Sequence, residues 1–144
     1  MHPFELPIRV IYADTDAMGI VYHANYIKWF ETGRTELMRS LGISWSEMEP
    51  LQCYFPVSKL SCHYLLPARY DDLLILKTHV DKLKRASISF SYSLYDEGKE
   101  RVLVRGSTLH ACTDEKGRII RIPEVIHSRI KEKHGEGENA WHEG

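Results

Sequence analysis

One long stretch of helical periodicity stands in an otherwise strand-like sequence of 144 residues. Between Ala24 and Leu41 a stripe of side chains recurs every three or four positions, and Gly42 follows in the place of a C-cap. The spacing predicts one helix over 24–41. Gly33 within it predicts a close approach to another backbone, or a tolerated defect. The stripe consists of Ile27, Phe30, Arg34, Leu37 and Leu41.

The remaining chain has the alternation and the β-branched and aromatic composition of strands. Turn-forming segments separate these strands, and the four long consecutive ones predict an antiparallel meander. A short helix is predicted at 44–49, where Ser44 and Glu47 have the spacing of a capping box. The order of elements predicts an α+β domain whose sheet wraps one face around the apolar stripe of the long helix. Strands are predicted at 6–12, 57–66, 72–84, 86–96, 101–114 and 118–122.

Length and charge limit the number of domains and the kinds of partner. A hydrophobic content of 43% supports one domain, predicted at 1–131, with a short helix after Pro123 and a polar, disordered tail at 132–144. The 19 basic and 20 acidic residues give a net charge of −1, which predicts no nucleic acid partner. No apolar run approaches the ~20 residues of a membrane span, and the N-terminal segment lacks the pattern of a secretion signal. We therefore expect a cytoplasmic protein without membrane insertion.

The cysteines and histidines lack the spacing of metal ligands. The three cysteines are an odd number without a C-x-x-C pair, and the eight histidines are scattered along the chain. No two histidines are spaced to place both imidazoles on one face of a helix. We expect neither disulfides nor a metal site.

The segment Asp14–Tyr26, DTDAMGIVYHANY, carries the pattern with the most chemical content. It places Asp14 and Asp16 in a loop just before the start of the predicted helix. The first amides of a helix have no internal partner, and with the helix dipole they form a donor site for a developing negative charge. A carboxylate near such a site can act as a base or a nucleophile, although two aspartates in a loop can also simply cap turns.

The pattern D-T-D-A-x-G-x-V-Y-H-x-N-Y, followed by a helix with E-x-x-R, resembles the signature of the 4-hydroxybenzoyl-CoA thioesterase and YbgC-like acyl-CoA thioesterase family, whose members have the hotdog fold. The similarity continues through Phe55–Val57, Tyr70–Ile75 and Lys84–Arg85, and covers about residues 6–130. The resemblance implies a single hotdog domain, with a curved antiparallel sheet wrapped around one long central helix. It also implies hydrolysis of an acyl-CoA to the free acid and CoA without a metal or bound cofactor, because CoA is part of the substrate.

Two residues of the segment match catalytic positions of the family. Asp16 matches the carboxylate that attacks the thioester carbonyl or activates water, and Asp14 is the second candidate. His23 lies at the predicted start of the helix, where the resemblance implies that its backbone N–H faces the carbonyl oxygen. A histidine here is a feature of the YbgC-like branch, whereas the 4-hydroxybenzoyl-CoA branch has a tyrosine. Participation of the His23 side chain, and the choice between covalent attack and water activation, stay open.

The resemblance also implies the contacts to the substrate. In the motif these are Tyr22, Asn25 and Tyr26, of which Asn25 can also bind loop carbonyls and support Asp16. Tyr26 belongs to an aromatic cluster that is equally consistent with a hydrophobic core. Phe55, Pro56 and Val57 align with the segment that faces the acyl group in the family.

Further matches concern the nucleotide end of the substrate and the assembly. Lys84 and Arg85 fall where the family has basic residues that contact CoA phosphates, although Ala86 replaces the third residue of that run and such a run is also typical of a solvated turn. In this family the site lies between two subunits. The resemblance therefore implies a homodimer, or a tetramer formed as a dimer of dimers.

The sequence leaves three functions in competition. The first is hydrolysis of a short or medium aliphatic, or an aromatic, acyl-CoA; the identity of the acyl group depends on the shape of the pocket. The second is an enoyl-CoA hydratase or dehydratase of the same fold, whose acid/base residues stand in a different local motif. The third is a non-catalytic acyl-CoA-binding protein.

Overall fold

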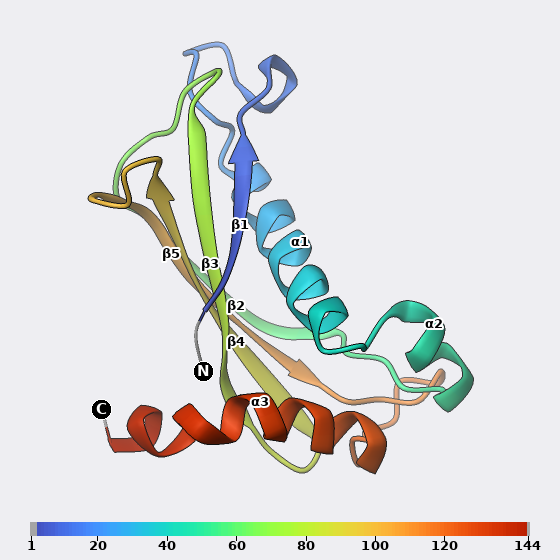
Figure 1. Ribbon diagram of the computed structural model, residues 1–144. Helices are drawn as coiled ribbons and strands as arrows, with labels where there is room; N and C mark the ends of the chain where they lie inside the picture. The colour runs from blue at the N-terminus through green and yellow to red at the C-terminus, as the bar shows by residue number, and fades with distance from the viewer. Residues whose placement is uncertain (1–2, 144) are drawn as a thin grey trace.

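The computed structural model describes residues 3–143, with side chains described through His134. Five antiparallel strands form one twisted sheet in the order β1-β3-β4-β5-β2, and the long helix α1 lies across one of its faces (Figure 1). The predicted α+β arrangement is confirmed. The elements are β1 (Phe4–Arg9), η1 (Tyr12–Asp14), α1 (Ala24–Ser40), α2 (Trp45–Met48), η2 (Glu49–Leu51), β2 (Val57–Tyr64), β3 (Leu73–Leu83), β4 (Ser87–Asp96), β5 (Val102–Ala111) and α3 (Glu124–Glu143).

The strand order differs from the predicted meander in the position of β2. Strands β3, β4 and β5 follow one another in the sheet as predicted, but β2 lies beside β5 at the opposite edge from β1. The reason is that β1 pairs with β3, from Phe4 opposite Thr78 to Arg9 opposite Leu73, and so occupies the edge that β2 would need. The long connection after β2 carries the chain across to β3, which leaves β2 as an edge strand.

The strand predicted at 118–122 is wrong. The segment makes one isolated bridge, between Thr113 and Ile119. Its next amides go to two different segments, since Ile120 donates to the carbonyl of Cys112 and Ile122 donates to that of Arg85. Because successive amides do not share one partner strand, no ladder forms.

The predicted helices are present with shifted ends. Helix α1 ends in a Schellman arrangement, in which Ile43 donates to the carbonyl of Met38 and Gly42 adopts a φ of +78°. The predicted capping box at Ser44 does not form, because the Ser44 hydroxyl pairs with Ser46 instead. Helix α3 starts where a short helix was expected and runs from Glu124 to Glu143, into the segment predicted as a polar tail. Disorder of that tail stays a prediction. A domain boundary at residue 131 stays a prediction.

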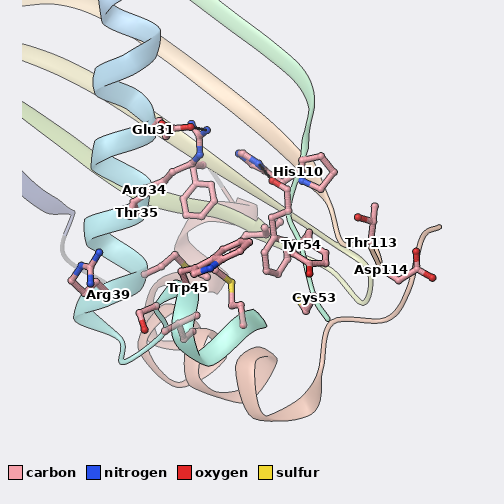
Figure 2. A pocket seen from close by; sticks show the side chains of 18 of the residues that line it. Glu31, Arg34, Thr35, Arg39, Trp45, Cys53, Tyr54, His110, Thr113 and Asp114 are labelled. Atoms are coloured by element: carbon pink, nitrogen blue, oxygen red, sulfur yellow. Dashed lines mark hydrogen bonds and ion pairs between the residues drawn. The ribbon is translucent and has the colours of Figure 1, made fainter. Parts of the chain in front are cut away.

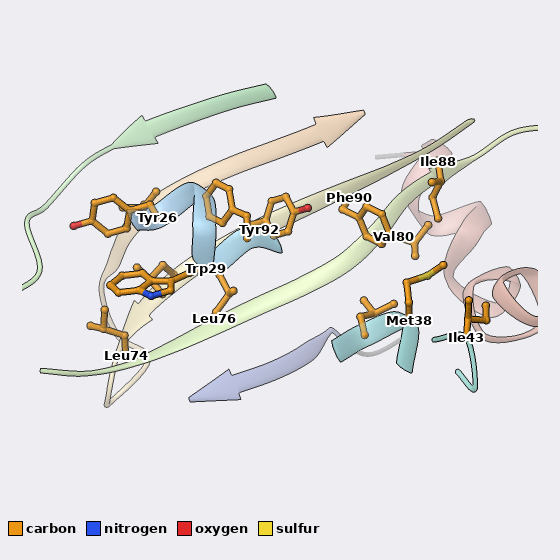
Figure 3. Close-up of a cluster of buried hydrophobic side chains, with 14 of the residues drawn as sticks. Tyr26, Trp29, Met38, Ile43, Leu74, Leu76, Val80, Ile88, Phe90 and Tyr92 are labelled. Carbon is orange, nitrogen blue, oxygen red and sulfur yellow. The ribbon is translucent and has the colours of Figure 1, made fainter. Parts of the chain in front are cut away.

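The helix packs so closely on the sheet that two contact positions must be glycine. A Cβ at Gly33 would collide with the side chains of Thr78 and Leu76 on β3, so the packing there is close, but against side chains and not against the backbone that the sequence predicted. A Cβ at Gly106 on β5 would collide with the ring of Phe30. Because Gly106 has no side chain, the Phe30 ring fits against β5, where it also stacks on Tyr92 with ring centroids 4.3 Å apart. Figure 3 shows the core that results between helix and sheet.

Candidate active site

The loop between β1 and α1 is organised by Asp14. The carboxylate of this buried residue accepts the backbone N–H of Ile11 at 3.0 Å. The backbone carbonyl of Asp14 accepts both the N–H of Tyr22 at 2.9 Å and the side-chain amide of Asn25 at 2.8 Å. The expected bond from Asn25 to a loop carbonyl is thereby confirmed. Asp14 uses its polar groups to hold the loop.

Asp16 is placed differently from Asp14. It is half-buried, and its Oδ1 accepts the N–H of Met18 at 2.8 Å. Its backbone closes a tight turn with Gly19 and Ile20, and Gly19 has a φ of +77° that favours glycine. Among the hydrogen bonds of residues 3–134, none uses Oδ2 of Asp16. One carboxylate oxygen of Asp16 is therefore open to another molecule.

His23 stands immediately before α1 with helical backbone angles. No hydrogen bond within the described part of the chain uses its backbone N–H, which lies at the positive end of a 17-residue helix. The hydroxyl of Tyr64, at the end of β2, donates to the His23 carbonyl at 3.3 Å. Burial raises the pKa of Tyr64 to about 12, so this phenol stays protonated as a donor. Tyr22 is exposed, and its ring centroid lies 4.4 Å from that of His23.

A cavity of about 760 Å³ lies near the other end of α1 (Figure 2). Phe55 and Pro56 are part of its wall, and Val57 follows with an exposed side chain. Tyr26 does not reach this cavity, because it is buried in the core, where its hydroxyl accepts the N–H of Ala68. Burial raises the pKa of Tyr26 as well. Its role as a substrate contact stays a prediction.

A chain of buried polar groups adjoins this cavity and was missed by the sequence analysis. Arg34 Nη1 lies 3.4 Å from the Tyr92 hydroxyl, which lies 2.6 Å from Oγ1 of Thr108. Thr108 Oγ1 lies 2.8 Å from Nε2 of His110, whose Nδ1 lies 2.9 Å from the carbonyl of Phe55. The available signal was Arg34, a charged residue within the apolar stripe of the predicted helix.

A second cavity, of about 560 Å³, lies between the β3–β4 turn and α3. Lys84 and Arg85 line it, and both side chains are exposed. Arg121 and Lys131 add positive charge to the same hollow, which the sequence pattern did not predict because they follow 36 to 47 residues later. Glu124 and Glu132 also line it and offset part of that charge.

Within one chain the structure does not bring all the predicted residues together. Asp16, His23 and Asn25 lie at the N-terminal end of α1, whereas Phe55 and Pro56 line a cavity together with Met38 and Arg39 from its other end. Arg34, beside the first cavity, is 11 residues along the helix from His23, or about 16 Å at the helical rise.

The described part of the chain contains neither a membrane-spanning helix nor a cluster of metal ligands. None of its helices combines the length and the apolar composition that crossing a bilayer requires. Nor does the described part bring three histidine, cysteine or acidic side chains together as a set of metal ligands.

Comparison with known proteins identifies the family. The model of the Thioesterase superfamily matches residues 18–103. The acyl-CoA thioesterase YbgC of Haemophilus influenzae is 39% identical over 112 residues, which are 77% of this chain and 81% of that protein.

Solved structures agree with this match. The crystal structure of a hypothetical protein from Aquifex aeolicus is 32% identical, with a TM-score of 0.83, and covers 90% of this chain and 100% of that one. A DHNA-CoA thioesterase from Staphylococcus aureus is 29% identical with a TM-score of 0.82, and covers 92% and 93% of the two chains. The predicted hotdog fold is therefore confirmed. Taken together, the matched model, the relative and the shared fold show that this chain belongs to the thioesterase superfamily.

Proposed function

We propose that this protein hydrolyses acyl-CoA thioesters to the free acid and CoA, with Asp16 as the reacting carboxylate. One observation carries the proposal: Asp16 keeps a carboxylate oxygen open at the same end of α1 where the His23 N–H has no partner in the described chain. A nucleophile or base together with a donor for a developing oxyanion is what acyl transfer requires. The relatives are named as thioesterases that act on acyl-CoA, which supports the same chemistry.

Two routes use the same geometry. In the covalent route, Asp16 attacks the thioester carbonyl, the C–S bond breaks, and CoA leaves as a thiolate that takes a proton from solvent. Water then hydrolyses the resulting anhydride. In the other route, Asp16 takes a proton from water, and the hydroxide adds to the carbonyl. The C–S bond then breaks, and the leaving thiolate takes the proton from Asp16, which becomes a carboxylate again. In both routes the N–H of His23 stabilises the negative oxygen of the tetrahedral intermediate. Neither route needs a metal or a bound cofactor.

The substrate contacts are proposed from the cavities. Phe55, Pro56 and the apolar wall of the first cavity suit a short or medium aliphatic or an aromatic acyl group. Lys84 and Arg85 line a concave basic surface that suits the CoA phosphates. Tyr22 is exposed beside His23, where it can cover the thioester.

We also propose that the active site is completed in a homodimer. Strand β2 has a partner on one side only, and Val57, Leu60 and Tyr64 are exposed along it. Antiparallel pairing of two β2 edges about a twofold axis would place Val57 of one subunit opposite Tyr64 of the other. Because Tyr64 bonds to His23, the partner subunit's Phe55 would then lie near the N-terminal end of α1. Further pairing into a tetramer and a cytoplasmic location are compatible with this proposal.

The test is to assay the wild type and Asp16→Asn for release of CoA thiol from a panel of aliphatic and aromatic acyl-CoAs. Both proteins are first compared by thermal melting and by size-exclusion chromatography, which also tests the dimer. We expect turnover by the wild type and a loss of about 10²–10⁴-fold in the folded variant. Equal turnover would reject Asp16, and no release from any substrate would move the function to a hydratase or to non-catalytic binding. Consumption of crotonyl-CoA without thiol release would identify the hydratase.

A further inference from the structure

Arg34 is an arginine whose charge is only weakly compensated. Its side chain is 17% exposed, and its one ion-pair partner among the described residues is Glu31, at 3.8 Å. Glu31 is 71% exposed, so this pair is solvated and weak. Of the other charged residues that line this cavity, Arg39 pairs with Glu36, Asp114 is bonded to Arg118 at 2.8 Å, and Glu115 is exposed. Arg34 alone presents a half-buried guanidinium to the cavity.

The polar groups behind Arg34 satisfy one another. A carbonyl can only accept, so Nδ1 of His110 carries a proton and donates to Phe55. Burial lowers the pKa of His110, so its Nε2 is bare and accepts the Thr108 hydroxyl. Thr108 in turn accepts the hydroxyl of Tyr92, whose oxygen accepts from Arg34. Each hydroxyl proton in this row of hydrogen bonds, from Arg34 to His110, is donated to a neighbour. The donors left for a ligand are therefore the remaining N–H groups of Arg34.

The wall around these donors is apolar. It is formed mainly by Met38, Ile43, Trp45, Phe55, Ile88 and Phe90. An alkyl or aryl ligand would pack against this wall but leave the positive charge of the Arg34 guanidinium without a partner. A carboxylate matches the planar donors of an arginine in charge and in geometry, and a low-dielectric wall strengthens the pair. The ligand that fits is therefore apolar along its length and anionic at its end.

We propose that Arg34 is a specificity-determining residue that binds a carboxylate at the far end of the acyl group, so that the preferred substrates are CoA monothioesters of dicarboxylic acids. This inference rests on the proposed thioesterase function and names its substrate class. Arg34 lies about 16 Å along α1 from His23 of the same chain. In the proposed dimer, a short acyl group at one Asp16 is accordingly bound by the partner subunit's Arg34.

The kinetic test compares two six-carbon substrates, adipyl-CoA with a terminal carboxylate and hexanoyl-CoA without one. The preference is the ratio of kcat/KM for adipyl-CoA to kcat/KM for hexanoyl-CoA, and we expect it to exceed one in the wild type. In Arg34→Gln we expect this ratio to fall by about 10- to 100-fold, as expected for the loss of a hydrogen-bonded charge. Arg101→Gln is the matched control, since Arg101 is an exposed arginine, paired with Asp96, that lines neither of the two cavities described above. It should keep the preference. A wild type without the preference, or an equal loss in both variants, would overturn the proposal.

A binding test separates this inference from the proposed function. Adipate and hexanoate are titrated calorimetrically into the wild type, Arg34→Gln and Glu31→Gln, after their melting temperatures are compared. We expect tighter binding of adipate by the wild type, loss of this difference in Arg34→Gln, and a larger difference in Glu31→Gln, which lacks the competing carboxylate. If no acyl-CoA is hydrolysed but adipate binding depends on Arg34, the proposed function fails and the carboxylate site stands. If acyl-CoAs are hydrolysed but adipate binds no better than hexanoate, the site is rejected and the function stands.

Arg34→Lys keeps the inference testable should Arg34→Gln fold poorly. A lysine retains the charge but not the planar set of donors. We expect it to keep part of the preference for adipyl-CoA. A full loss of preference in Arg34→Lys with an unchanged melting temperature would also overturn the proposal, because charge would then play no role.

Discussion

The two ends of α1 are built in different ways. The N-terminal end is made by one continuous segment, Asp14–Tyr26. Its loop is held mainly by hydrogen bonds among its own residues and to the adjacent Ile11 and Tyr12, with a few bonds to the distant residues Tyr64 and Ala68. The other end is made by side chains from α1, β4, β5 and the loop before β2, which meet only in the folded sheet. The first end exposes its reactive groups, while the second buries a polar chain. The N-terminal end of α1 is therefore formed by residues that are neighbours in sequence, and we call it the local end. The other end, where we propose that the acyl group is selected, is formed by residues far apart in sequence, and we call it the distributed end.

The largest change in stability is expected at the distributed end, from Thr108→Val. Thr108 is 1% exposed, and its hydroxyl serves both Tyr92 and His110. Valine has nearly the same shape but would leave the buried Tyr92 hydroxyl without its acceptor and Nε2 of His110 without its donor. We expect a loss of about 2–4 kcal/mol in the free energy of unfolding, measured by urea denaturation. Thr108→Ser, which keeps the hydroxyl, should lose clearly less; equal losses would show that the methyl group and not the hydrogen bonds stabilises this end.

The second prediction separates the two aspartates of the local end. Asp14→Ala removes the buried acceptor of the Ile11 N–H and should cost about 1–3 kcal/mol in unfolding free energy. Asp16→Ala removes a half-buried carboxylate whose partner is the exposed Met18 N–H, and should cost about 0.5 kcal/mol or less. Urea denaturation of both variants tests the difference. A larger loss for Asp16 would mean that Asp16, and not Asp14, organises the loop.

The contrast between the ends also explains what the sequence could predict. The long helix, its Gly42 cap and the turn at Gly19 depend on nearby residues, so periodicity and glycine positions predict them. The same holds for the motif around Asp16. The position of β2 and the failed strand at 118–122 depend on which distant segment occupies an edge or accepts an amide, and no local pattern reports that.

The polar chain from Arg34 to His110 shows this limit most clearly. Thr108 and His110 alternate on β5 as in many strands, and nothing near them in sequence identifies Tyr92 and Arg34 as partners. Arg34 in the apolar stripe was the one anomaly visible beforehand. A charged residue at a core-facing position indicates a buried partner or a ligand, but only the fold shows which groups surround it.

The third prediction uses pH to weaken the distributed end selectively. Burial lowers the pKa of His110 from its ordinary value of 6.5. Between the two pKa values the unfolded chain binds a proton that the folded chain does not, so the free energy of unfolding falls as the pH drops from about 6.5 toward the folded pKa. His110→Asn should flatten this part of the stability profile. His79, whose pKa burial also lowers, should leave a residual slope; an unchanged slope in His110→Asn would show that His110 is not held neutral.

The smallest effect is expected from Tyr64→Phe, which removes the bond from the β2 edge to the His23 carbonyl. This bond is 3.3 Å long and its donor is 48% exposed, so we expect a loss below about 0.5 kcal/mol at low protein concentration. The local end would then keep its geometry without help from β2, and kcat/KM should change little. A loss that grows at concentrations where the protein dimerises would place Tyr64 in the proposed β2 interface. A loss above about 1 kcal/mol in dilute monomer would instead contradict the contrast between the two ends of α1. The stability of the N-terminal end would then depend on a distant strand as strongly as that of the other end does.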